Sequence, residues 1–228
     1  MYFLQKYFLC ILLFGVSSSG WALRGFSSAT PTFYVNAAYG LATTKSKFIE
    51  SNDTSTGLSY EVGGYAGKHG SIGFAYRTDT METDFELNSS SSLYTWKDTI
   101  LRYRLGFLYM GAVFNTMNLT VNQQGTDRID GLGTGIGGNL GLLFSVANRG
   151  YLFIDAITVP KTNIINELDT EVSIRGRLMT DLGAAFNLTR YFDLVFGYRQ
   201  QSFTLETDAS YKEQYLLTYF GAKFFLVF

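Results

Sequence analysis

Few residues of this chain carry side chains that commonly serve as nucleophiles or general bases. The 228-residue sequence contains one histidine, His69, and one cysteine, Cys10. His69 follows Lys68 in a short glycine-flanked segment, where a histidine is usually an ordinary polar turn residue. Cys10 lies in an N-terminal apolar stretch that we expect to be removed. The mature chain then offers no thiol for nucleophilic catalysis, for thiolate metal binding or for a disulfide.

Clustered carboxylates are the next candidates for chemistry. Asp79, Glu82, Asp84 and Glu86 follow one another closely. A pair such as Asp79 and Asp84 could exchange protons with a substrate, although only their proximity marks them. Their spacing does not match an EF-hand loop, which places its ligands and a glycine at fixed positions. The sequence therefore predicts neither a metal site nor a bound cofactor.

The glycines Gly133, Gly135 and Gly138 spell the dinucleotide-binding pattern G-x-G-x-x-G. That site requires a helix directly after the glycines. Asn139-Leu140-Gly141-Leu142 follows instead, and this alternation is typical of a strand. We interpret these glycines as close-packed strand residues.

The charged residues must be positioned by β-strands in which apolar and polar residues alternate. The chain is 46% hydrophobic, yet its mean hydropathy is only +0.07 and it contains 24 glycines. Such a chain suits a barrel whose lipid-facing and lumen-facing residues alternate. A turn at Gly106-Phe107 divides an apolar stretch that is too long for one strand, since about 9–11 residues cross a membrane. The predicted strands are Thr32–Thr43, Gly57–Gly67, Ser71–Thr80, Thr95–Leu105, Leu108–Val121, Gly131–Ala147, Tyr151–Val159, Glu171–Leu188, Tyr191–Phe203 and Tyr211–Phe228.

Both ends of the chain carry export signals. Met1 to Ala22 has a basic residue, Lys6, a short apolar stretch and small residues at Gly20 and Ala22, as in a cleaved signal peptide. We expect residues 23–228 to form one domain. At the other end, apolar residues stand at every second position up to a terminal phenylalanine. They are Phe220, Ala222, Phe224, Leu226 and Phe228.

This C-terminal segment resembles the last strand of Gram-negative outer-membrane β-barrels. The resemblance implies a transmembrane antiparallel up-and-down β-barrel in the cell outer membrane, closed by its last strand. It also implies that the barrel assembly machinery reads this segment. We predict ten strands, with eight and twelve as the alternatives, short periplasmic turns and longer polar extracellular loops. We expect a monomer in contact with outer-membrane lipid and lipopolysaccharide, and no nucleic-acid partner.

The charged residues within the strands share the parity of small and polar residues, so we expect them to face the lumen, because exposure to lipid is costly. We expect Arg102, Arg104, Arg175 and Arg177 to meet the acids Asp155, Asp181, Asp193 or Glu61, with Asp181 and Asp155 as the foremost partners. The residues of opposite parity, such as Ile174, are expected to face lipid. Bases outnumber acids in the predicted lumen network, which consists of Glu61, Arg77, Arg102, Arg104, Asp155, Arg175, Arg177, Asp181, Asp193, Arg199 and Lys223. This network either plugs the barrel through hydrogen bonds or lines a narrow, mildly cationic water path.

Acids dominate the predicted outer loops and strand ends. They include Asp79, Glu82, Asp84, Glu86, Asp127, Asp130, Glu167, Asp169, Glu206 and Asp208. An acidic outer face could bind divalent cations or basic partners. The alternative is a set of solvated polar loops that bind no ligand. The favoured function is a structural or surface-interaction role without catalysis. The alternatives are a small passive channel and, third, an outer-membrane enzyme acting on lipid or peptide.

Overall fold

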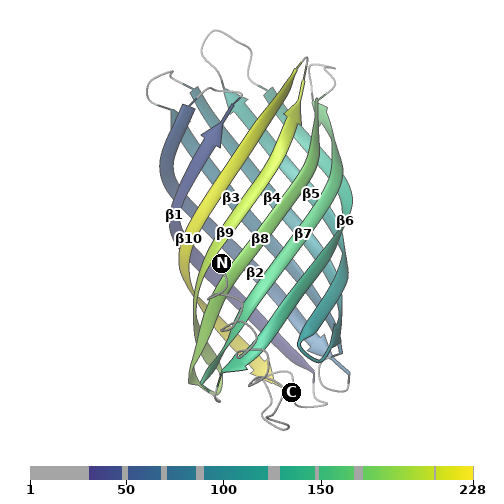
Figure 1. Ribbon diagram of the computed structural model, residues 1–228, viewed down its shortest axis with the longest axis vertical. Helices are drawn as coiled ribbons and strands as arrows, with labels where there is room; N and C mark the ends of the chain where they lie inside the picture. Colours follow the sequence, from purple (N-terminus) through teal and green to yellow (C-terminus); the bar gives the residue numbers. More distant parts are fainter. Residues whose placement is uncertain are drawn as a thin grey trace, which may run out of the picture.

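The structure, a computed structural model, describes residues 31–47, 51–67, 71–85, 90–122, 129–146, 149–166, 172–207 and 209–227. These residues form ten antiparallel strands that close into one barrel, each paired with its neighbours in chain order and β1 with β10 (Figure 1). The predicted all-β, ten-stranded, up-and-down barrel is confirmed. The strands are β1 Thr32–Ser46, β2 Ser51–Ala66, β3 Ile72–Phe85, β4 Ser90–Leu105, β5 Leu108–Asn122, β6 Ile129–Val146, β7 Gly150–Asn166, β8 Val172–Thr189, β9 Phe192–Glu206 and β10 Ser210–Val227.

We call the end of the barrel where β1 begins and β10 finishes the lower end, and the opposite end the upper end, as in Figure 1. The lower end contains the predicted turn between β4 and β5, where Gly106 has a φ of 62°. This left-handed conformation favours glycine and reverses the chain in two residues. In a barrel of the outer-membrane type the lower end is periplasmic and the upper end is extracellular.

The strands are longer than predicted, mainly at the upper end. They contain between 14 residues in β3 and 18 residues in β6, whereas about 9–11 residues cross a membrane. Much of the predicted loops Thr44–Thr56, Met81–Tyr94 and Lys161–Thr170 is strand. Polar and serine-rich stretches hide these extensions, because the apolar alternation stops where the strands leave the lipid while the backbone pairing continues.

Alternation along each strand places apolar side chains on the outside of the barrel, as expected. On β1, Phe33 and Leu41 are 43% and 67% exposed, whereas the inward Tyr34 and Ala38 are buried. The expected assembly residues Phe220, Phe224 and Leu226 face outward on β10, where Ala222 is half-buried. This strand pairs with β1 and closes the barrel. Whether assembly machinery reads it stays a prediction, and Phe228 lies outside the described residues.

A bulge in β8 overturns part of the predicted register. Gly176 has a φ of 59°, and the pairing of β8 with β9 shifts between Arg175 and Leu178. Above the bulge the parity is therefore reversed: Ile174, which we expected outside, is fully buried, and Arg175 is exposed. Pro160 of β7 lies opposite the bulge, between the pairs Val159–Arg177 and Lys161–Arg175. A proline is tolerated there because it has no N–H to donate to a neighbouring strand.

Several expectations fall outside the described residues, namely the signal peptide Met1–Ala22, His69, and the acids Glu86, Asp127, Glu167, Asp169 and Asp208. Within the described part of the chain, we find no helix of the length and apolar character needed to cross a membrane. The glycines of the G-x-G-x-x-G pattern lie within β6.

Candidate functional site

The inward-facing side chains change in character from the upper to the lower end of the barrel. The upper half of the lumen is filled by apolar side chains, a charged layer crosses the middle, and a cavity occupies the lower half. We call the apolar filling the upper core. It consists of Met81, Tyr94, Trp96, Met117, Leu119, Ile164, Val172, Ile174, Phe203, Leu205, Tyr215 and Leu217.

One ion pair of the charged layer lies directly beneath the upper core. Arg177 of β8 donates to both carboxylate oxygens of Asp98 on β4, at 2.7 and 2.9 Å, and to Oε1 of Gln201 at 3.0 Å. Its guanidinium also lies 4.3 Å from the ring centroid of Trp96. Two-point contact between arginine and carboxylate is among the stronger ionic hydrogen bonds. Because both residues are fully buried, the loss of either would leave a bare charge inside the barrel.

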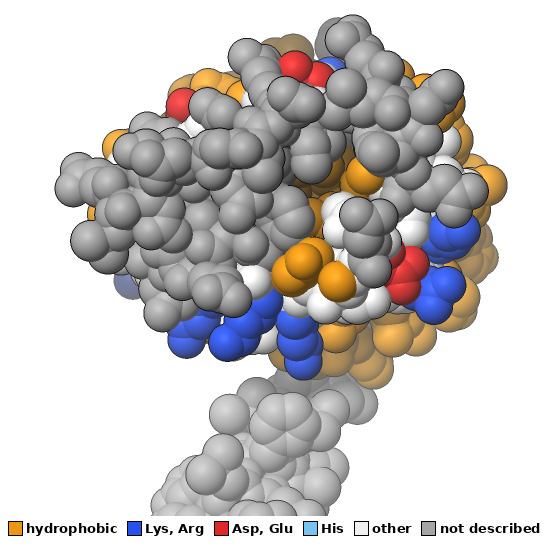
Figure 2. Space-filling view, turned by 90° about the horizontal axis from the view of Figure 1, so that it is seen from above, with side chains coloured by type: hydrophobic (Ala, Val, Ile, Leu, Met, Phe, Trp, Pro, Cys, Tyr) orange, Lys and Arg blue, Asp and Glu red, His pale blue; other side chains and the backbone are white. Residues whose placement is uncertain are grey.

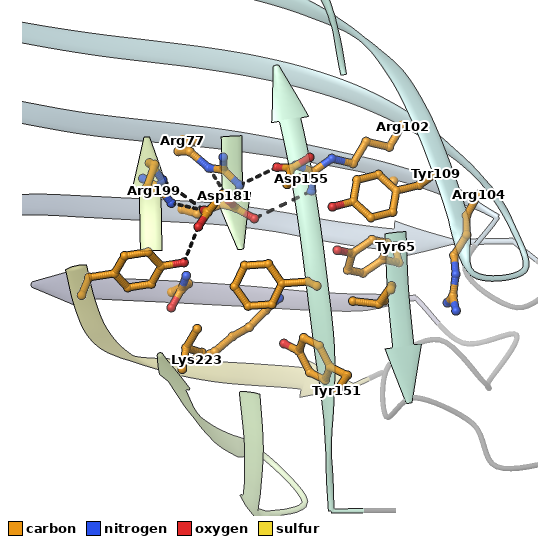
Figure 3. A pocket seen from close by; sticks show the side chains of 17 residues that line it. Tyr65, Arg77, Arg102, Arg104, Tyr109, Tyr151, Asp155, Asp181, Arg199 and Lys223 are labelled. Atoms are coloured by element: carbon orange, nitrogen blue, oxygen red, sulfur yellow. Dashed lines mark hydrogen bonds and ion pairs between the residues drawn. The ribbon is translucent and has the colours of Figure 1, made fainter. Parts of the chain in front are cut away.

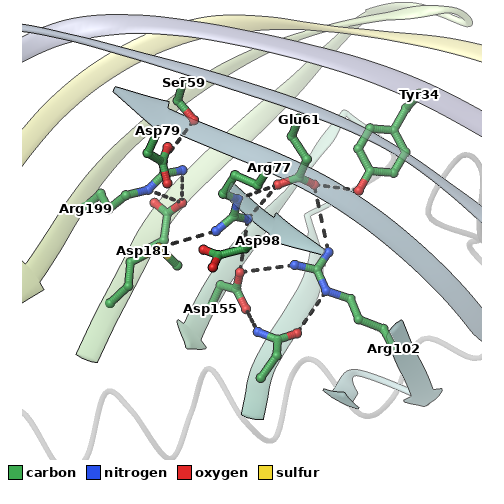
Figure 4. Close-up of polar contacts among 12 residues, drawn as sticks. Tyr34, Ser59, Glu61, Arg77, Asp79, Asp98, Arg102, Asp155, Asp181 and Arg199 are labelled. Atoms are coloured by element: carbon green, nitrogen blue, oxygen red, sulfur yellow. Dashed lines mark hydrogen bonds and ion pairs between the residues drawn. The ribbon is translucent and has the colours of Figure 1, made fainter. Parts of the chain in front are cut away.

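A second group links β2 and β3 to β7 across the lumen. Arg77 donates from Nε to Glu61 at 2.7 Å and from Nη2 to Asp155 at 3.1 Å (Figure 4). Tyr34 donates to the other oxygen of Glu61 at 2.5 Å. Since Arg77 and Asp155 lie on opposite walls, their ion pair holds the two sides of the barrel together.

Arg102 of β4 completes this second group. It donates from Nη2 to Asp155 at 3.3 Å and from Nε to Asn139 at 2.9 Å. Asn139 of β6 in turn donates to Asp155 at 2.5 Å. Asp155 therefore receives hydrogen bonds from three different strands, which offsets the cost of burying its charge.

A third group is centred on Arg199 of β9. It donates to Asp181 from Nε at 3.0 Å and from Nη2 at 2.6 Å, and to Ser59 at 2.9 Å. It also pairs with Asp79 of β3 (Figure 4). Tyr219 donates to the second oxygen of Asp181 at 2.8 Å. Asp79, expected at the outer rim, is instead a buried partner within the lumen.

Most of the predicted network faces the lumen. Arg104 and Lys223 are half-buried at the lower end, where Lys223 lies opposite Asp193 in the strand register. Arg175 does not belong to the network: its side chain is 64% exposed and pairs with Glu206 at 3.2 Å on the outer surface. The buried members are Glu61, Arg77, Arg102, Asp155, Arg177, Asp181, Asp193 and Arg199.

The predicted partners are right for Arg102, which pairs with Asp155 and Glu61, and wrong for Arg177, which binds Asp98 rather than Asp181. Sequence reasoning missed Asp98 and Asp79 as lumen residues. Parity along the strand would have found both, because Asp98 stands four residues before Arg102 and Asp79 two residues after Arg77.

The lumen does not have the excess of positive charge that we had expected. Among the described residues, buried carboxylates outnumber buried arginines, and only Arg104 and Lys223 add further, half-buried, positive charge inside. The buried carboxylates are Glu61, Asp79, Asp98, Asp155, Asp181, Asp193 and Glu213, and the buried arginines are Arg77, Arg102, Arg177 and Arg199.

A cavity of about 80 Å³ lies in the lower half of the lumen, beneath the charged layer (Figure 3). Tyrosines form much of its wall and contribute Tyr65, Tyr109 and Tyr151. Lys223 reaches into this region, with its ammonium 3.8 Å from the ring centroid of Tyr34. A polar space of this size has room for water molecules, since about 10–15 Å³ of such volume accommodates one.

Glycines on neighbouring strands make room for the aromatic rings of this wall. A Cβ added at Gly141 would collide with the ring of Tyr109, and one added at Gly183 would lie 2.5 Å from the ring of Phe153. The rings therefore rest against the bare backbone of the next strand. This arrangement leaves space for the cavity between the walls of the lower lumen.

The described carboxylates of the lumen are engaged in hydrogen bonds and ion pairs. In the described ranges no group of three or more His, Cys, Asp or Glu side chains is arranged to hold a metal ion. The carboxylates that line the cavity are Glu61, Asp155 and Asp181, and arginine binds each of them. Such carboxylates stabilise the barrel and are poorly placed to accept a proton from a substrate.

Comparison with known proteins gives information on the fold only. No protein-family model matches the chain, and no curated protein sequence matches it. Among solved structures, the outer-membrane protease OmpT from Escherichia coli matches with 7% identity and a TM-score of 0.50, covering 94% of this chain and 100% of that one. Neisserial surface protein A matches with 13% identity, a TM-score of 0.43 and coverage of 84% and 96%. The attachment invasion locus protein Ail of Yersinia pestis matches with 11% identity, a TM-score of 0.38 and coverage of 87% and 100%.

Proposed function

We propose, on the premise that this protein has the fold of the outer-membrane β-barrels, that it is a closed, non-conducting barrel which presents its upper end at the cell surface. Its role is structural or interactive, and the described residues suggest no catalytic step. In this proposal the barrel is a monomer, contacts outer-membrane lipid and lipopolysaccharide, and is inserted by the barrel assembly machinery.

The packed upper core is the observation that carries this proposal. Trp96 is fully buried, and Phe203, 3% exposed, lies with its ring centroid 5.2 Å from that of Trp96. Arg177 and Asp98 join opposite walls just below them. A lumen filled in this way leaves little room for ions, and barrels of about eight strands are commonly filled by side chains. The passive channel is therefore the weaker candidate.

The lengths of the strands favour a role at the upper end. Strands such as β6, with 18 residues, exceed the roughly 9–11 residues that a membrane crossing requires. The excess raises the upper connections above the lipid surface. A barrel with a filled lumen and raised connections is suited to hold a surface for contact with other molecules.

Enzymatic activity receives less support. Asp79, one member of the carboxylate pair that we considered for catalysis, is buried and bound by Arg199. A carboxylate held by an arginine inside the lumen cannot reach a substrate at the outer surface.

Conductance measurements test the closed barrel. Purified protein inserted into planar lipid bilayers is expected to show no steady single-channel current. Heat-modifiable migration of the reconstituted protein on gels shows that the barrel is folded in the bilayer lipid. Regular current steps from the unmodified protein would overturn the closed-barrel proposal in favour of the channel.

Epitope accessibility tests which end is at the cell surface. An epitope inserted between β5 and β6, within residues 123–128, should bind antibody on intact cells. The same epitope inserted at residues 147–148 should bind only after the outer membrane is permeabilised. The reverse pattern would contradict the proposed orientation.

A further inference from the structure

Basic side chains gather on one side of the outer surface near the upper end. Lys45 of β1, Lys47 directly after β1 and Lys212 of β10 are all exposed and point outward. Lys161 of β7 and Arg175 of β8 continue the series, with their Cα positions paired. Because β7, β8, β9, β10 and β1 are consecutive in the barrel wall, these residues form one continuous arc. We call the five residues the basic arc.

Lys45, Lys47 and Lys212 lie close together at one end of the arc. The backbone N–H of Lys47 donates to the carbonyl oxygen of Lys212 at 3.3 Å. Lys45 stands two residues before Lys47 and therefore shares its face. Neighbouring strands are about 4.8 Å apart and alternate residues about 7 Å apart, so the three ammonium groups can reach one anionic group together.

Among the residues that the structure describes, acidic side chains offset only part of this charge. Glu206 of β9 faces outward and pairs with Arg175 at 3.2 Å. Glu213 stands next to Lys212 in the sequence but points into the barrel, where it is 2% exposed and receives a hydrogen bond from Ser46 at 3.0 Å. The same oxygen of Glu213 accepts a hydrogen bond from the backbone N–H of Lys47 at 3.0 Å, so this carboxylate lies close to the backbone of Lys47, whereas the lysine side chain is exposed.

The opposite half of the barrel has no comparable excess of bases among its described residues. Lys97 of β4 shares that half with the carboxylates of Glu82 on β3 and Asp130 on β6. Seen from above, the Lys and Arg side chains gather along one part of the rim (Figure 2). The described outer surface from β7 to β1 is thus predominantly basic near the upper end, while the expected loop acids Glu167, Asp169 and Asp208 lie outside the described residues.

The depth of the lysines indicates what they meet. Leu41, four residues before Lys45 on the same face, is 67% exposed, and Phe220 on the neighbouring β10 is 58% exposed. These side chains belong to the apolar band that faces lipid tails. Lys45, Lys47 and Lys212 lie above this band, at the level of the lipid headgroups, where phosphates attract basic side chains.

We propose that Lys45, Lys47 and Lys212 form a binding site for the phosphates of a membrane glycolipid, namely the phosphorylated glucosamine headgroup of lipopolysaccharide. Arg175 and Lys161 extend the site along the wall. The lysines point away from the barrel above a lipid-facing surface, so the site favours a lipid of the outer leaflet over a soluble anion. This inference rests on the proposed orientation, with the upper end at the cell surface; the epitope experiment tests that orientation separately from the lipid retention described below.

Lipid retention by the full barrel tests the site. The protein is folded in vesicles of phosphatidylcholine that contain a small fraction of bisphosphorylated lipid A, then extracted in mild detergent and purified, and the retained lipid A is measured by mass spectrometry. The triple variant Lys45→Gln, Lys47→Gln and Lys212→Gln should retain about tenfold less lipid A than the unmodified protein, or lower still. Dephosphorylated lipid A should be retained poorly by both proteins.

A matched variant removes three positive charges elsewhere. Lys97→Gln, Arg149→Gln and Arg190→Gln lie outside the arc and should leave lipid A retention unchanged. The triple Lys→Arg variant at positions 45, 47 and 212 should also retain lipid A, and heat-modifiable migration on gels shows that every variant is folded. Equal loss in the matched variant, or full retention in the triple Gln variant, would overturn the site. Displacement of lipid A by millimolar inorganic phosphate would show a general anion site instead and would also overturn the proposal.

Discussion

The same ten strands build the upper and lower halves of the lumen, yet the upper half is filled by side chains and the lower half contains a cavity. In the upper half, side chains such as Trp96 and Phe203 meet across the lumen and fill it. In the lower half, rings such as those of Tyr109 and Phe153 rest on glycines of the next strand and leave a cavity. The comparison shows that side-chain size and the placement of glycine, rather than strand count, determine where a small barrel is solid.

The charged layer between the two halves should be the most sensitive part of the interior. Arg177→Ala leaves Asp98 buried without its cation, and we expect it to lower the free energy of unfolding by about 4 kcal/mol. Urea titration of the barrel in detergent micelles, followed by heat-modifiable migration, measures the change. Arg175→Ala, two residues away but on the outer surface, is the control and should change stability by less than about 0.5 kcal/mol. Similar losses for both variants would contradict the bulge at Gly176.

Equivalent truncations in the two halves should have unequal effects. Phe203→Ala removes a ring that is 3% exposed and packed against Trp96, with an expected cost of about 3 kcal/mol. Phe153→Ala removes a half-buried ring that borders the cavity, and its cost should be about half as large because fewer contacts are lost. The same urea titrations measure both. A greater loss for Phe153→Ala would show that the lower half is the better packed.

Filling the lower cavity should be less costly than emptying the upper core. A methyl group at Gly141 collides with the ring of Tyr109, so Gly141→Ala should force that ring into the cavity at a cost of about 2 kcal/mol. The double variant Gly141→Ala with Tyr109→Ala should recover part of this loss. Gly138→Ala, where the nearest atom lies 3.9 Å from the added methyl group, is the matched control. If Gly138→Ala lowers the free energy of unfolding as much as Gly141→Ala does, the contact between the Tyr109 ring and Gly141 is not the cause of the loss.

The smallest expected effect concerns the bulge that separates Arg175 from Arg177. Gly176→Ala retains the bulge but places a side chain at a φ of 59°, with an expected cost of about 1 kcal/mol. Deletion of Gly176 should remove the bulge but keep Ile174 inward and Arg175 outward, because Arg175 then directly precedes the inward Arg177. A cysteine placed at position 174 should therefore stay protected from a maleimide with or without Gly176, whereas a cysteine at position 175 should be labelled in both proteins. Labelling at position 174 in the protein that retains Gly176 would contradict the reversal of parity.

The sequence by itself determined the architecture of this protein. Apolar residues at every second position, interrupted by turn residues such as Gly106, predict both the barrel and its ten strands, because the two faces of a strand follow a local period of two. The same period places Arg77, Arg102 and Asp155 in the lumen. No partner residue is needed for these conclusions, since each depends only on neighbours along the chain.

Only the tertiary structure decided which inward charges meet and where the alternation breaks. The partner of Arg177 is Asp98, 79 positions away, because closure of the barrel brings β8 and β4 to facing positions across the lumen. The glycine at position 176 carries no local sign that it forms a bulge, and the reversal of Ile174 and Arg175 appears only in the pairing with β7 and β9. Register and closure are properties of many strands together, so a period read along one strand cannot contain them.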